Sequence, residues 1–368
     1  MSMAFLDEHN FSGGPGVLPA SVLLQVQQAI LQVPELGISL LGVSHRSDWF
    51  AQVVAEAESH VRYLLNLEDD FAVLFLQGGA TQQFSMVPMT FLAGSSSPAD
   101  YLDTGYWSHK SLPHAACIGP MRTAWSGQAR GYCDLPVRHE VDYDPRAPYM
   151  HYVSNETVEG LQFHDVPGLD SVPRVCDMSS DFLSRWVDMK RYALVYAHAQ
   201  KNLGPAGVTL VLVRKSWLAQ SCQTDLPDFL DYRQHMQAHS ILNTPPVFAI
   251  YVVLLVLRWL RYEVGGLDKM QAINAAKAGK VYNCLERLGD DVVIHATAAC
   301  RSQMNAVFHF SHPEWQQRFL DLSQRAGFIG LEGHRSVGGV RISMYNAMQP
   351  HAIDDLVEWV AEFCRLQG

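Results

Sequence analysis

Apolar residues in the first part of the chain recur at helical spacing in two stretches. The first begins after Pro19 and stops at Pro34, and the second covers residues 48–65. Recurrence at intervals of three and four residues is typical of amphipathic helices, and proline marks the ends of the first stretch. The pattern therefore predicts two helices, with residues 44–46 on the connection between them.

From residue 71 onward, short apolar runs alternate with helical stretches. The first run ends at a pair of glycines, and a helix is expected to follow from about Gln82. The runs cover residues 71–76, 99–102, 147–153, 172–176, 193–196 and 208–213. Strands that alternate with helices are typical of a mostly parallel sheet covered by helices on both faces. The predicted fold class is therefore α/β.

The pattern changes after about residue 265. A long helix at 269–288 is followed by apolar segments at 292–296 and 304–310, another helix, a strand at 339–343 and a last helix from Ile353. This arrangement predicts a smaller α+β part. We therefore expect a large domain at 16–265 and a small domain formed by 266–368 together with 1–15.

The net charge and the cysteine content limit the classes of protein to which this sequence can belong. The net charge of -10 at pH 7 argues against nucleic acid or an anionic membrane as the main partner, because both select basic surfaces. Seven scattered cysteines without a Cys-x-x-Cys pair suit reduced thiols in a cytoplasm, and no metal site is expected. Residues 1–14 lack the features of a signal peptide. The apolar run 247–257 is about half the roughly 20 residues that cross a bilayer, which favours a buried or interface helix.

Lys201 is the first candidate for chemistry. It follows the apolar run 193–196 and precedes a turn rich in glycine and proline. A lysine held at the end of a buried strand loses solvation, which lowers its pKa and makes its amine a nucleophile toward an aldehyde. On this segment alone, a solvated lysine at a strand end is the favoured explanation.

Asp177 ends the preceding predicted strand. In a parallel sheet the carboxyl ends of neighbouring strands meet at the ligand crevice, so Asp177 is expected near Lys201. A carboxylate there can keep a pyridine nitrogen protonated, which makes the ring an electron sink. The alternative is that Asp177 caps the N-terminus of a following helix.

Three further positions follow predicted strands. Residues 78–81, Gly-Gly-Ala-Thr, lie between a strand and a helix, where backbone N–H groups can bind a phosphate, although no Walker sequence is present. Trp107 could stack on a planar ring, or simply pack in the core. Thr157 could donate to a ring hydroxyl or a phosphate, or serve only as a turn hydroxyl.

Basic residues form two clusters on connections that contain glycine or serine. One is His45 with Arg46, and the other is His334 with Arg335 and Arg341. In an acidic protein such arginines suit capture of carboxylates and phosphates, since the guanidinium group can bind both oxygens of an anion. Solvated surface arginines are the alternative.

Taken together, these positions resemble the phosphoserine aminotransferases over nearly the whole chain. The segments that carry the resemblance occur in the family's order at 11–15, 43–46, 103–107, 152–157, 199–207, 243–246 and 333–348. The resemblance implies a homodimer of fold type I that depends on pyridoxal 5'-phosphate, with two active sites at the subunit interface. The fold implied is a large domain with a mostly parallel mixed sheet between helices, plus a smaller α+β C-terminal domain.

The resemblance also implies roles for the cofactor-binding residues. Lys201 would form the Schiff base and shuttle protons, and Asp177 would contact the pyridine nitrogen. Trp107 would stack on the ring, and Thr157 would bind on its hydroxyl side. The phosphate would be held by a set from both subunits, which comprises Ala80, Thr81 and Gln200 together with Asn243 and Thr244 of the partner subunit.

Substrate binding would fall to the basic clusters. By resemblance, His45 and Arg46 bind the glutamate side chain or the substrate phosphate, and Arg341 binds the α-carboxylate. His334 and Arg335 add positive charge. The family reaction is ping-pong transfer of the amino group of L-glutamate to 3-phosphooxypyruvate, which gives O-phospho-L-serine and 2-oxoglutarate. Many bacterial members also convert 3-hydroxy-2-oxo-4-phosphooxybutanoate to 4-phosphooxy-L-threonine for pyridoxine synthesis.

Two positions depart from the family pattern. Bacterial relatives often carry a third glycine and an arginine where this chain has Ala80 and Thr81, so a cation on the substrate side is missing. His198 replaces the small residue that often precedes Ala-Gln-Lys.

Three alternatives stay open at this point. One is a transaminase of another specificity within fold type I, and the second is a desulfurase of that fold, for which Cys222 is the best-placed cysteine. The third is a regulatory protein that binds the cofactor without catalysis, but no basic helix-turn-helix segment supports it.

Overall fold

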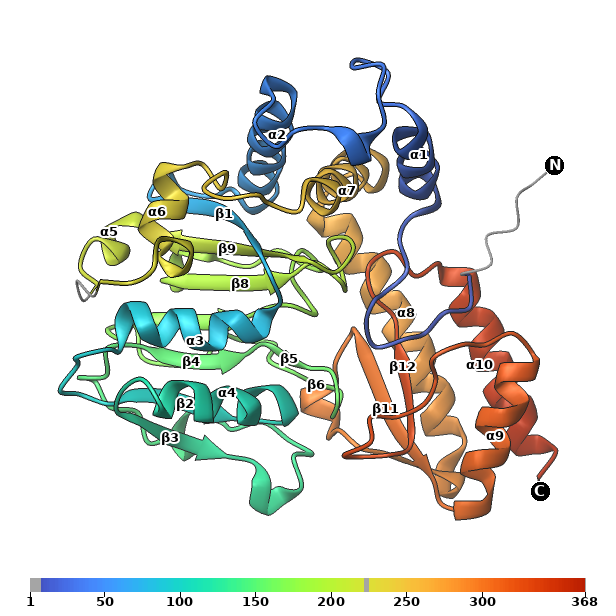
Figure 1. Ribbon diagram of the computed structural model, residues 1–368. Helices are drawn as coiled ribbons and strands as arrows, with labels where there is room; N and C mark the ends of the chain where they lie inside the picture. The colour runs from blue at the N-terminus through green and yellow to red at the C-terminus, as the bar shows by residue number, and fades with distance from the viewer. Residues whose placement is uncertain (1–7, 222–224, 368) are drawn as a thin grey trace.

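The computed structural model describes residues 8–221 and 225–367, so Cys222 lies outside the described residues. Within these residues a seven-stranded sheet forms the larger part, in the order β1-β9-β8-β7-β4-β2-β3 (Figure 1). Strand β9 runs antiparallel to both neighbours, whereas the other neighbouring pairs are parallel. The bounds are β1 Phe71–Gln77, β2 Ala99–Asp103, β3 Met121–Ser126, β4 Met150–Val153, β7 Arg174–Asp177, β8 Leu194–His198 and β9 Val208–Arg214. The predicted mostly parallel sheet is confirmed.

Helices cover both faces of this sheet. Edge strand β1 is buried on both faces, because Val73 and Phe75 belong to one hydrophobic cluster, while Leu74 and Leu76 belong to another on the opposite face. The first cluster includes residues of α2 and α7, and the second includes residues of α3 and α4. The helices of this part are α1 Ala20–Leu31, α2 Asp48–Leu65, α3 Ala80–Phe91, α4 Tyr106–Ala116, α5 Lys215–Leu218, α6 Tyr232–Gln237 and α7 Val247–Arg258.

Helix α3 begins earlier than the sequence pattern predicted. Gly79 is its N-cap, so Ala80 and Thr81 lie in the first helical turn and not in the preceding loop. The difference follows from the weak apolar signal of this first turn, which carries alanine, threonine and glutamine. As a consequence, the unpaired N–H groups of the helix end belong to the Gly-Gly-Ala-Thr segment itself.

The smaller part packs an antiparallel sheet, in the order β10-β11-β12, against three helices. Its elements are α8 Leu267–Arg287, β10 Val292–Ile294, β11 Asn305–Phe310, α9 Pro313–Arg325, β12 Val340–Ser343 and α10 Pro350–Arg365. Phe11 is buried in the same cluster, and its backbone N–H donates to the carbonyl of Ile329 at 2.8 Å. The domain boundary at 265/266 stays a prediction, because Leu267 and Met270 of α8 pack in the core of the larger part.

The apolar segment after Pro246 forms α7 and lies inside the larger part, as predicted. Across residues 8–221 and 225–367, no helix has the length and apolar character needed to cross a membrane.

One buried lysine holds the segment of the smaller part that contacts the larger part. Lys277 on α8 is 1% exposed, and its Nζ donates to the backbone carbonyls of Met344 at 3.2 Å, Tyr345 at 2.7 Å and Met348 at 3.2 Å. The same segment contacts the turn after β8, since the N–H of Asn346 donates to Oδ1 of Asn202 at 2.9 Å. Lys277 therefore supports the segment that borders the carboxyl edge of the large sheet.

We predict that Lys277→Met lowers the free energy of unfolding by about 2–4 kcal/mol, because it leaves several buried carbonyls without a donor. Urea denaturation followed by circular dichroism measures the change. Lys280→Met on the same helix is the matched control, since Lys280 is half exposed and forms an ion pair with the exposed Asp354. Its loss is expected to stay below about 1 kcal/mol. Equal losses for the two variants would contradict this role of Lys277.

Candidate active site

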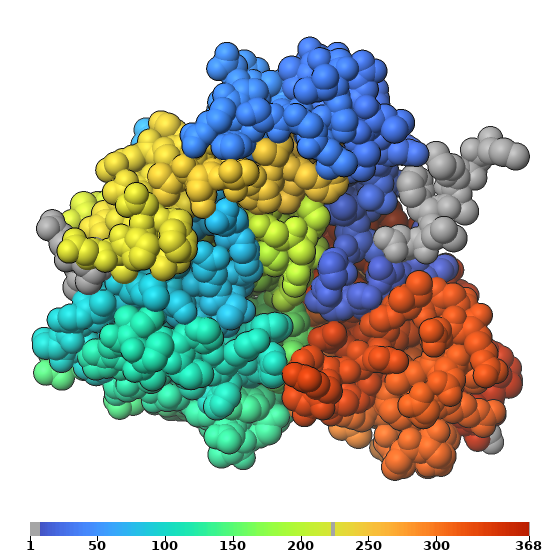
Figure 2. All heavy atoms as spheres, in the orientation of Figure 1, coloured from blue at the N-terminus to red at the C-terminus, as the bar shows by residue number. Residues whose placement is uncertain are grey.

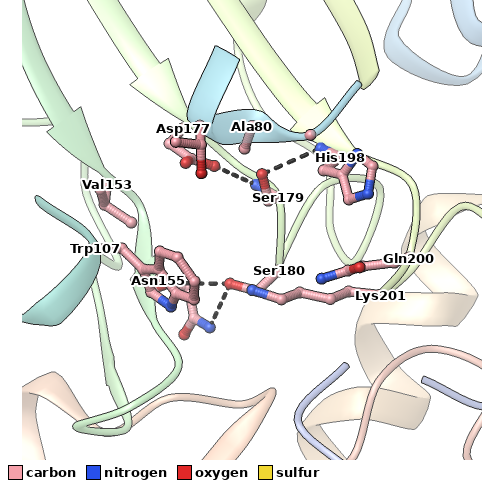
Figure 3. Close-up of a pocket in the computed structure, with 12 residues that line it drawn as sticks. Ala80, Trp107, Val153, Asn155, Asp177, Ser179, Ser180, His198, Gln200 and Lys201 are labelled. Carbon is pink, nitrogen blue, oxygen red and sulfur yellow. Dashed lines mark hydrogen bonds between the residues drawn. The ribbon is translucent and has the colours of Figure 1, made fainter. Parts of the chain in front are cut away.

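Five strand ends of the large sheet meet around one cavity. Strands β1, β2, β4, β7 and β8 run in the same direction, so their carboxyl ends share an edge of the sheet. The cavity has a volume of about 160 Å³ and is lined by Gly79, Ala80, Thr81, Trp107, Val153, Asn155, Asp177, Ser179, Ser180, His198, Gln200 and Lys201 (Figure 3). In Figure 2 the molecular face is hollowed between the blue N-terminal segment, the teal residues and the orange C-terminal part.

Lys201 lies on the turn that follows β8, with 9% of its surface exposed. Burial lowers the pKa of its amine to about 8, the charge of Asp177 raises it, and the charge of Arg341 lowers it. The turn is held on both sides, because Gly204 N–H donates to the carbonyl of Ala199 at 2.8 Å and Gly16 N–H donates to that of Gln200 at 2.8 Å. The sequence-predicted nucleophile is therefore a buried amine with a depressed pKa on a fixed turn.

Asp177 is the last residue of β7, the strand next to β8, and is 4% exposed. One carboxylate oxygen accepts from the N–H of Ser179 at 2.8 Å. Burial raises the pKa of Asp177, while hydrogen bonds from Ser179 and the charge of Lys201 lower it. Residues 178–185 form turns and bends, so no helix begins there for Asp177 to cap. A buried carboxylate in a cavity is suited to a cationic ligand group.

Trp107 and Thr157 are joined directly. The indole Nε1–H of Trp107 donates to Oγ1 of Thr157 at 2.9 Å. The Trp107 ring also faces Lys201, whose Nζ lies 5.4 Å from the ring centroid. Trp107 lines the cavity and Thr157 contacts its indole ring, so the structure brings together the predicted ring-binding residues.

Two glutamates that sequence reasoning missed hold the start of α4. Glu156 accepts from the backbone N–H groups of Trp107 at 2.9 Å and Ser108 at 2.8 Å, and Glu159 accepts from that of Tyr106 at 2.9 Å. Both are buried, and burial raises the pKa of Glu156 and raises that of Glu159 to about 9. Both carboxyl groups accept from N–H groups that have no partner within the helix, and these hydrogen bonds fix Trp107.

The N-terminus of α3 supplies the second wall of the cavity. Ala80 and Thr81 line it in the first turn of the helix, where N–H groups have no intrahelical partner. Gln200 lies across from them on the turn after β8 (Figure 3). Hydrogen-bond donors and the positive helix end therefore converge on one part of the cavity, as an anion requires.

Arg341, His334 and Arg335 gather near the cavity entrance. Arg341 is on β12, and its Nε is buried without a hydrogen-bond partner. The ring of His334 lies 4.6 Å from that of Tyr106 at the start of α4. Burial lowers the pKa of His334, and the charges of Arg341, Arg335 and Lys110 lower it further. In the described part of the chain no carboxylate forms an ion pair with any of these four basic residues, so an anionic ligand would be their counter-charge.

His45, Arg46, Asn243 and Thr244 do not line the cavity of their own chain. Arg46 lies instead beside the second pair, since its guanidinium donates to the carbonyls of Ile241 at 3.2 Å and Leu242 at 3.5 Å. Arg46 and Thr244 are both exposed. The structure thus groups these sequence-predicted residues with one another and apart from Lys201.

Ser179, Ser180 and Asn155 are cavity residues that sequence reasoning did not identify. Asn155 Nδ2 donates to Oγ of Ser180 at 2.8 Å and to Oδ1 of Asn305 at 2.9 Å. Ser179 follows Asp177 by two residues, so its position after a strand end was the available signal. Asn155 lies next to the predicted Thr157 and could have been found in the same way.

Comparison with known proteins places this architecture among transaminases. The family described as aminotransferase class-V matches residues 9–356. The phosphoserine aminotransferase of Laribacter hongkongensis is 45% identical over 360 residues, which cover 98% of this chain and 99% of the relative. That of Herpetosiphon aurantiacus is 42% identical over the same shares.

Two solved structures show the same architecture. Phosphoserine aminotransferase from Bacillus circulans subsp. alkalophilus has a TM-score of 0.95 at 41% identity, over 98% of this chain and 99% of that one. The phosphoserine aminotransferase with bound PLP from Trichomonas vaginalis has a TM-score of 0.89 at 32% identity, over 96% and 99%.

We predict that the reaction of Lys201 with an aldehyde speeds up about tenfold per pH unit below pH 8 and levels off above it, because the neutral amine is the nucleophile. Pyridoxal is added to apoprotein, trapped with borohydride, and quantified on the Lys201 peptide by mass spectrometry. Arg341→Met is expected to move the midpoint to higher pH, because it removes a positive charge. A midpoint near the ordinary lysine pKa would contradict the burial of this amine.

Proposed function

The chain belongs to the class-V aminotransferase family, and on that basis we propose that it transfers the amino group of L-glutamate to 3-phosphooxypyruvate. The products are O-phospho-L-serine and 2-oxoglutarate, which places the reaction in serine biosynthesis. The observation that carries the proposal is similarity to phosphoserine aminotransferases over 98% of the chain. The predicted family and the predicted fold type I architecture are confirmed by the same comparisons.

The enzyme depends on pyridoxal 5'-phosphate, and the cavity suits this cofactor. A buried carboxylate, an indole ring and a buried amine surround one region, and the free N–H groups of α3 lie at another. These groups match a protonated pyridine nitrogen, a planar ring, an aldehyde and a phosphate, in that order.

We assign the cofactor contacts accordingly. Asp177 would hold the ring nitrogen in its protonated form, and this cation would relieve the cost of the buried carboxylate. Trp107 would stack on the ring, while Thr157, which already accepts from the indole N–H, would keep its own hydroxyl proton for the cofactor. The phosphate would be held by the backbone of Ala80 and by Thr81 and Gln200.

We assign substrate binding to the basic residues at the entrance. Arg341 has a buried Nε without a partner, so it is available for the α-carboxylate that both substrates carry. His334 and Arg335 add charge that favours a doubly anionic substrate. The protein as a whole has a net charge of -10, so the positive charge is confined to this entrance. This local charge would let an acidic protein select phosphorylated keto acids.

Proton movement falls to Lys201. When bound, the cofactor supplies an electron sink for the electrons left on the substrate carbon. The Lys201 amine, whose pKa lies near 8, takes the proton from that carbon and delivers it to the adjacent reacting carbon. Asp177 keeps its negative charge throughout. Two such half-reactions in sequence give ping-pong kinetics.

We also propose that the enzyme aminates 3-hydroxy-2-oxo-4-phosphooxybutanoate for pyridoxine synthesis. This compound shares the keto acid and phosphate groups of 3-phosphooxypyruvate, so the same basic residues would bind it. We place the enzyme in the cytoplasm, which suits the free thiols of the six cysteines in the described ranges.

A homodimer with shared active sites explains the four predicted residues that lie apart from Lys201. Asn243 and Thr244 would reach the phosphate in the other subunit, and His45 and Arg46 would reach its substrate. The contact of Arg46 with the carbonyls of residues 241 and 242 supports this assignment, because it holds the two pairs together as one unit.

The half-reactions test the function directly. We expect the purified enzyme to show a visible absorption band from the Lys201-bound cofactor, which glutamate bleaches and 3-phosphooxypyruvate restores. Lys201→Ala should lack the band and lose at least about 10³-fold in kcat, because it removes both the cofactor attachment and the base. A band that glutamate bleaches but only an unphosphorylated keto acid restores would show a transaminase of another specificity.

Hybrid dimers test the shared sites. Lys201→Ala and Arg46→Ala should each be nearly inactive, but a mixed dimer holds one site with both residues intact. Activity should therefore recover to about one quarter of wild type after random subunit exchange, because half the dimers are mixed and each has one complete site. Mixing Lys201→Ala with Arg341→Ala is the matched control and should give no recovery, because both residues serve the site of their own subunit and each site of a mixed dimer then lacks one of them. No recovery with Arg46→Ala would place Arg46 in the same subunit's site.

A further inference from the structure

His198 lines the cavity and has no role in the function described above. It is the last residue of β8, three positions before Lys201 (Figure 3). Only 8% of its surface is exposed. Burial lowers its pKa most and the positive charge of Lys201 lowers it further, while hydrogen bonds to the backbone of Gly78 and Val208 raise it by less. The side chain is therefore a neutral imidazole at neutral pH.

A short relay links this imidazole to the turn before α3. Nδ1 of His198 lies 3.0 Å from Oγ1 of Thr209, and Oγ1 of Thr209 donates to the carbonyl of Gly78 at 2.8 Å. The hydroxyl has a single proton, and a carbonyl oxygen can only accept it. Thr209 must therefore accept from His198, which fixes the proton of the neutral ring on Nδ1.

The turn at the end of this relay is the one whose helix receives the phosphate. Gly78 directly precedes Gly79, the N-cap of α3, and has a φ of 98°, a conformation that glycine adopts readily. Two consecutive glycines leave the backbone free to reorient when nothing holds it. Two hydrogen bonds limit that freedom just before the N–H groups of Ala80 and Thr81: the N–H of Gly78 donates to the carbonyl of Gly207 at 3.1 Å, and the carbonyl of Gly78 accepts from Thr209.

Phosphate binding at this site depends on such orientation. Thr81 supplies no charge, so the backbone N–H groups and the helix end provide the attraction. Hydrogen bonds of this kind weaken steeply when the angle deteriorates.

We propose that His198 is a positioning residue that holds the phosphate-binding turn through Thr209 and thereby increases affinity for the phosphate group of the cofactor. The proposal rests on the proposed function insofar as pyridoxal phosphate is the ligand. It assigns the effect to Nδ1–H, which is present in the neutral ring and in the protonated ring alike. The gain in affinity is therefore expected to be the same from pH 6 to pH 8.

The test compares binding of pyridoxal phosphate and pyridoxal to the full-length apoenzyme by equilibrium dialysis. His198→Gly should bind pyridoxal phosphate about tenfold more weakly, which corresponds to the loss of one well-formed hydrogen bond, and should bind pyridoxal as the wild type does. Thr209→Val should show the same selective loss. The double variant should lose no more than either single one, since all three break one relay.

Two amide substitutions separate the relay from a direct contact. His198→Asn places an N–H group close to the position of Nδ1 and should restore affinity, whereas His198→Gln mimics Nε2 and should not. Rescue by glutamine but not asparagine, a loss that grows with falling pH, or additive losses in the double variant would overturn the relay. Equal weakening for pyridoxal would overturn it as well, because the effect would not concern the phosphate.

Failure of the proposed function would look different from failure of this inference. Wild-type protein that binds neither pyridoxal phosphate nor pyridoxal would contradict the cofactor assignment itself. Wild-type binding with an unaffected His198→Gly variant would overturn only the role of His198.

Discussion

An amine and a carboxylate buried at the ends of two neighbouring parallel strands are the constraint on which the rest of the structure depends. Lys201 and Asp177 both lose solvation there, and each moves the pKa of the other toward the charged form. Neither group would be stable so deep without a partner of complementary chemistry. The parallel sheet places the two groups at one edge, and the cofactor then completes the set of charges.

A pair of buried glutamates fixes the position of Trp107. Glu156 and Glu159 accept hydrogen bonds from the first N–H groups of α4. The helix start is therefore fixed by side chains from another segment of the same chain and not by its own N-cap, Gly105. A Cβ at Gly105 would lie 2.6 Å from Glu159 Oε2, which explains the glycine there. The wall of the cavity is therefore rigid before any ligand arrives, and its aromatic ring is oriented by the same segment that contributes Thr157.

The sequence predicted most elements because their patterns are local, and it missed those whose stability comes from distant contacts. Strand β3 was not predicted, since it is half exposed at the edge of the sheet and lacks a clear alternation. Lys201, Asp177 and Trp107 follow strong strand signals, so their convergence could be foreseen. Glu156 and Glu159 could not, because charged residues are ordinarily exposed and only tertiary contacts reveal their helix-capping role. The grouping of Arg46 with residues 241 and 242 likewise joins segments almost 200 positions apart.

Recognition of the two phosphate groups relies on backbone geometry for one and on charged side chains for the other. The loop at α3 carries no cation, yet the chain keeps four basic groups at the cavity entrance without carboxylate partners in the described residues. With backbone donors for one anion and side-chain cations for the other, each phosphate has its own site. Such a division demands a well-fixed turn, because dipolar donors lose strength with orientation far faster than a full charge does.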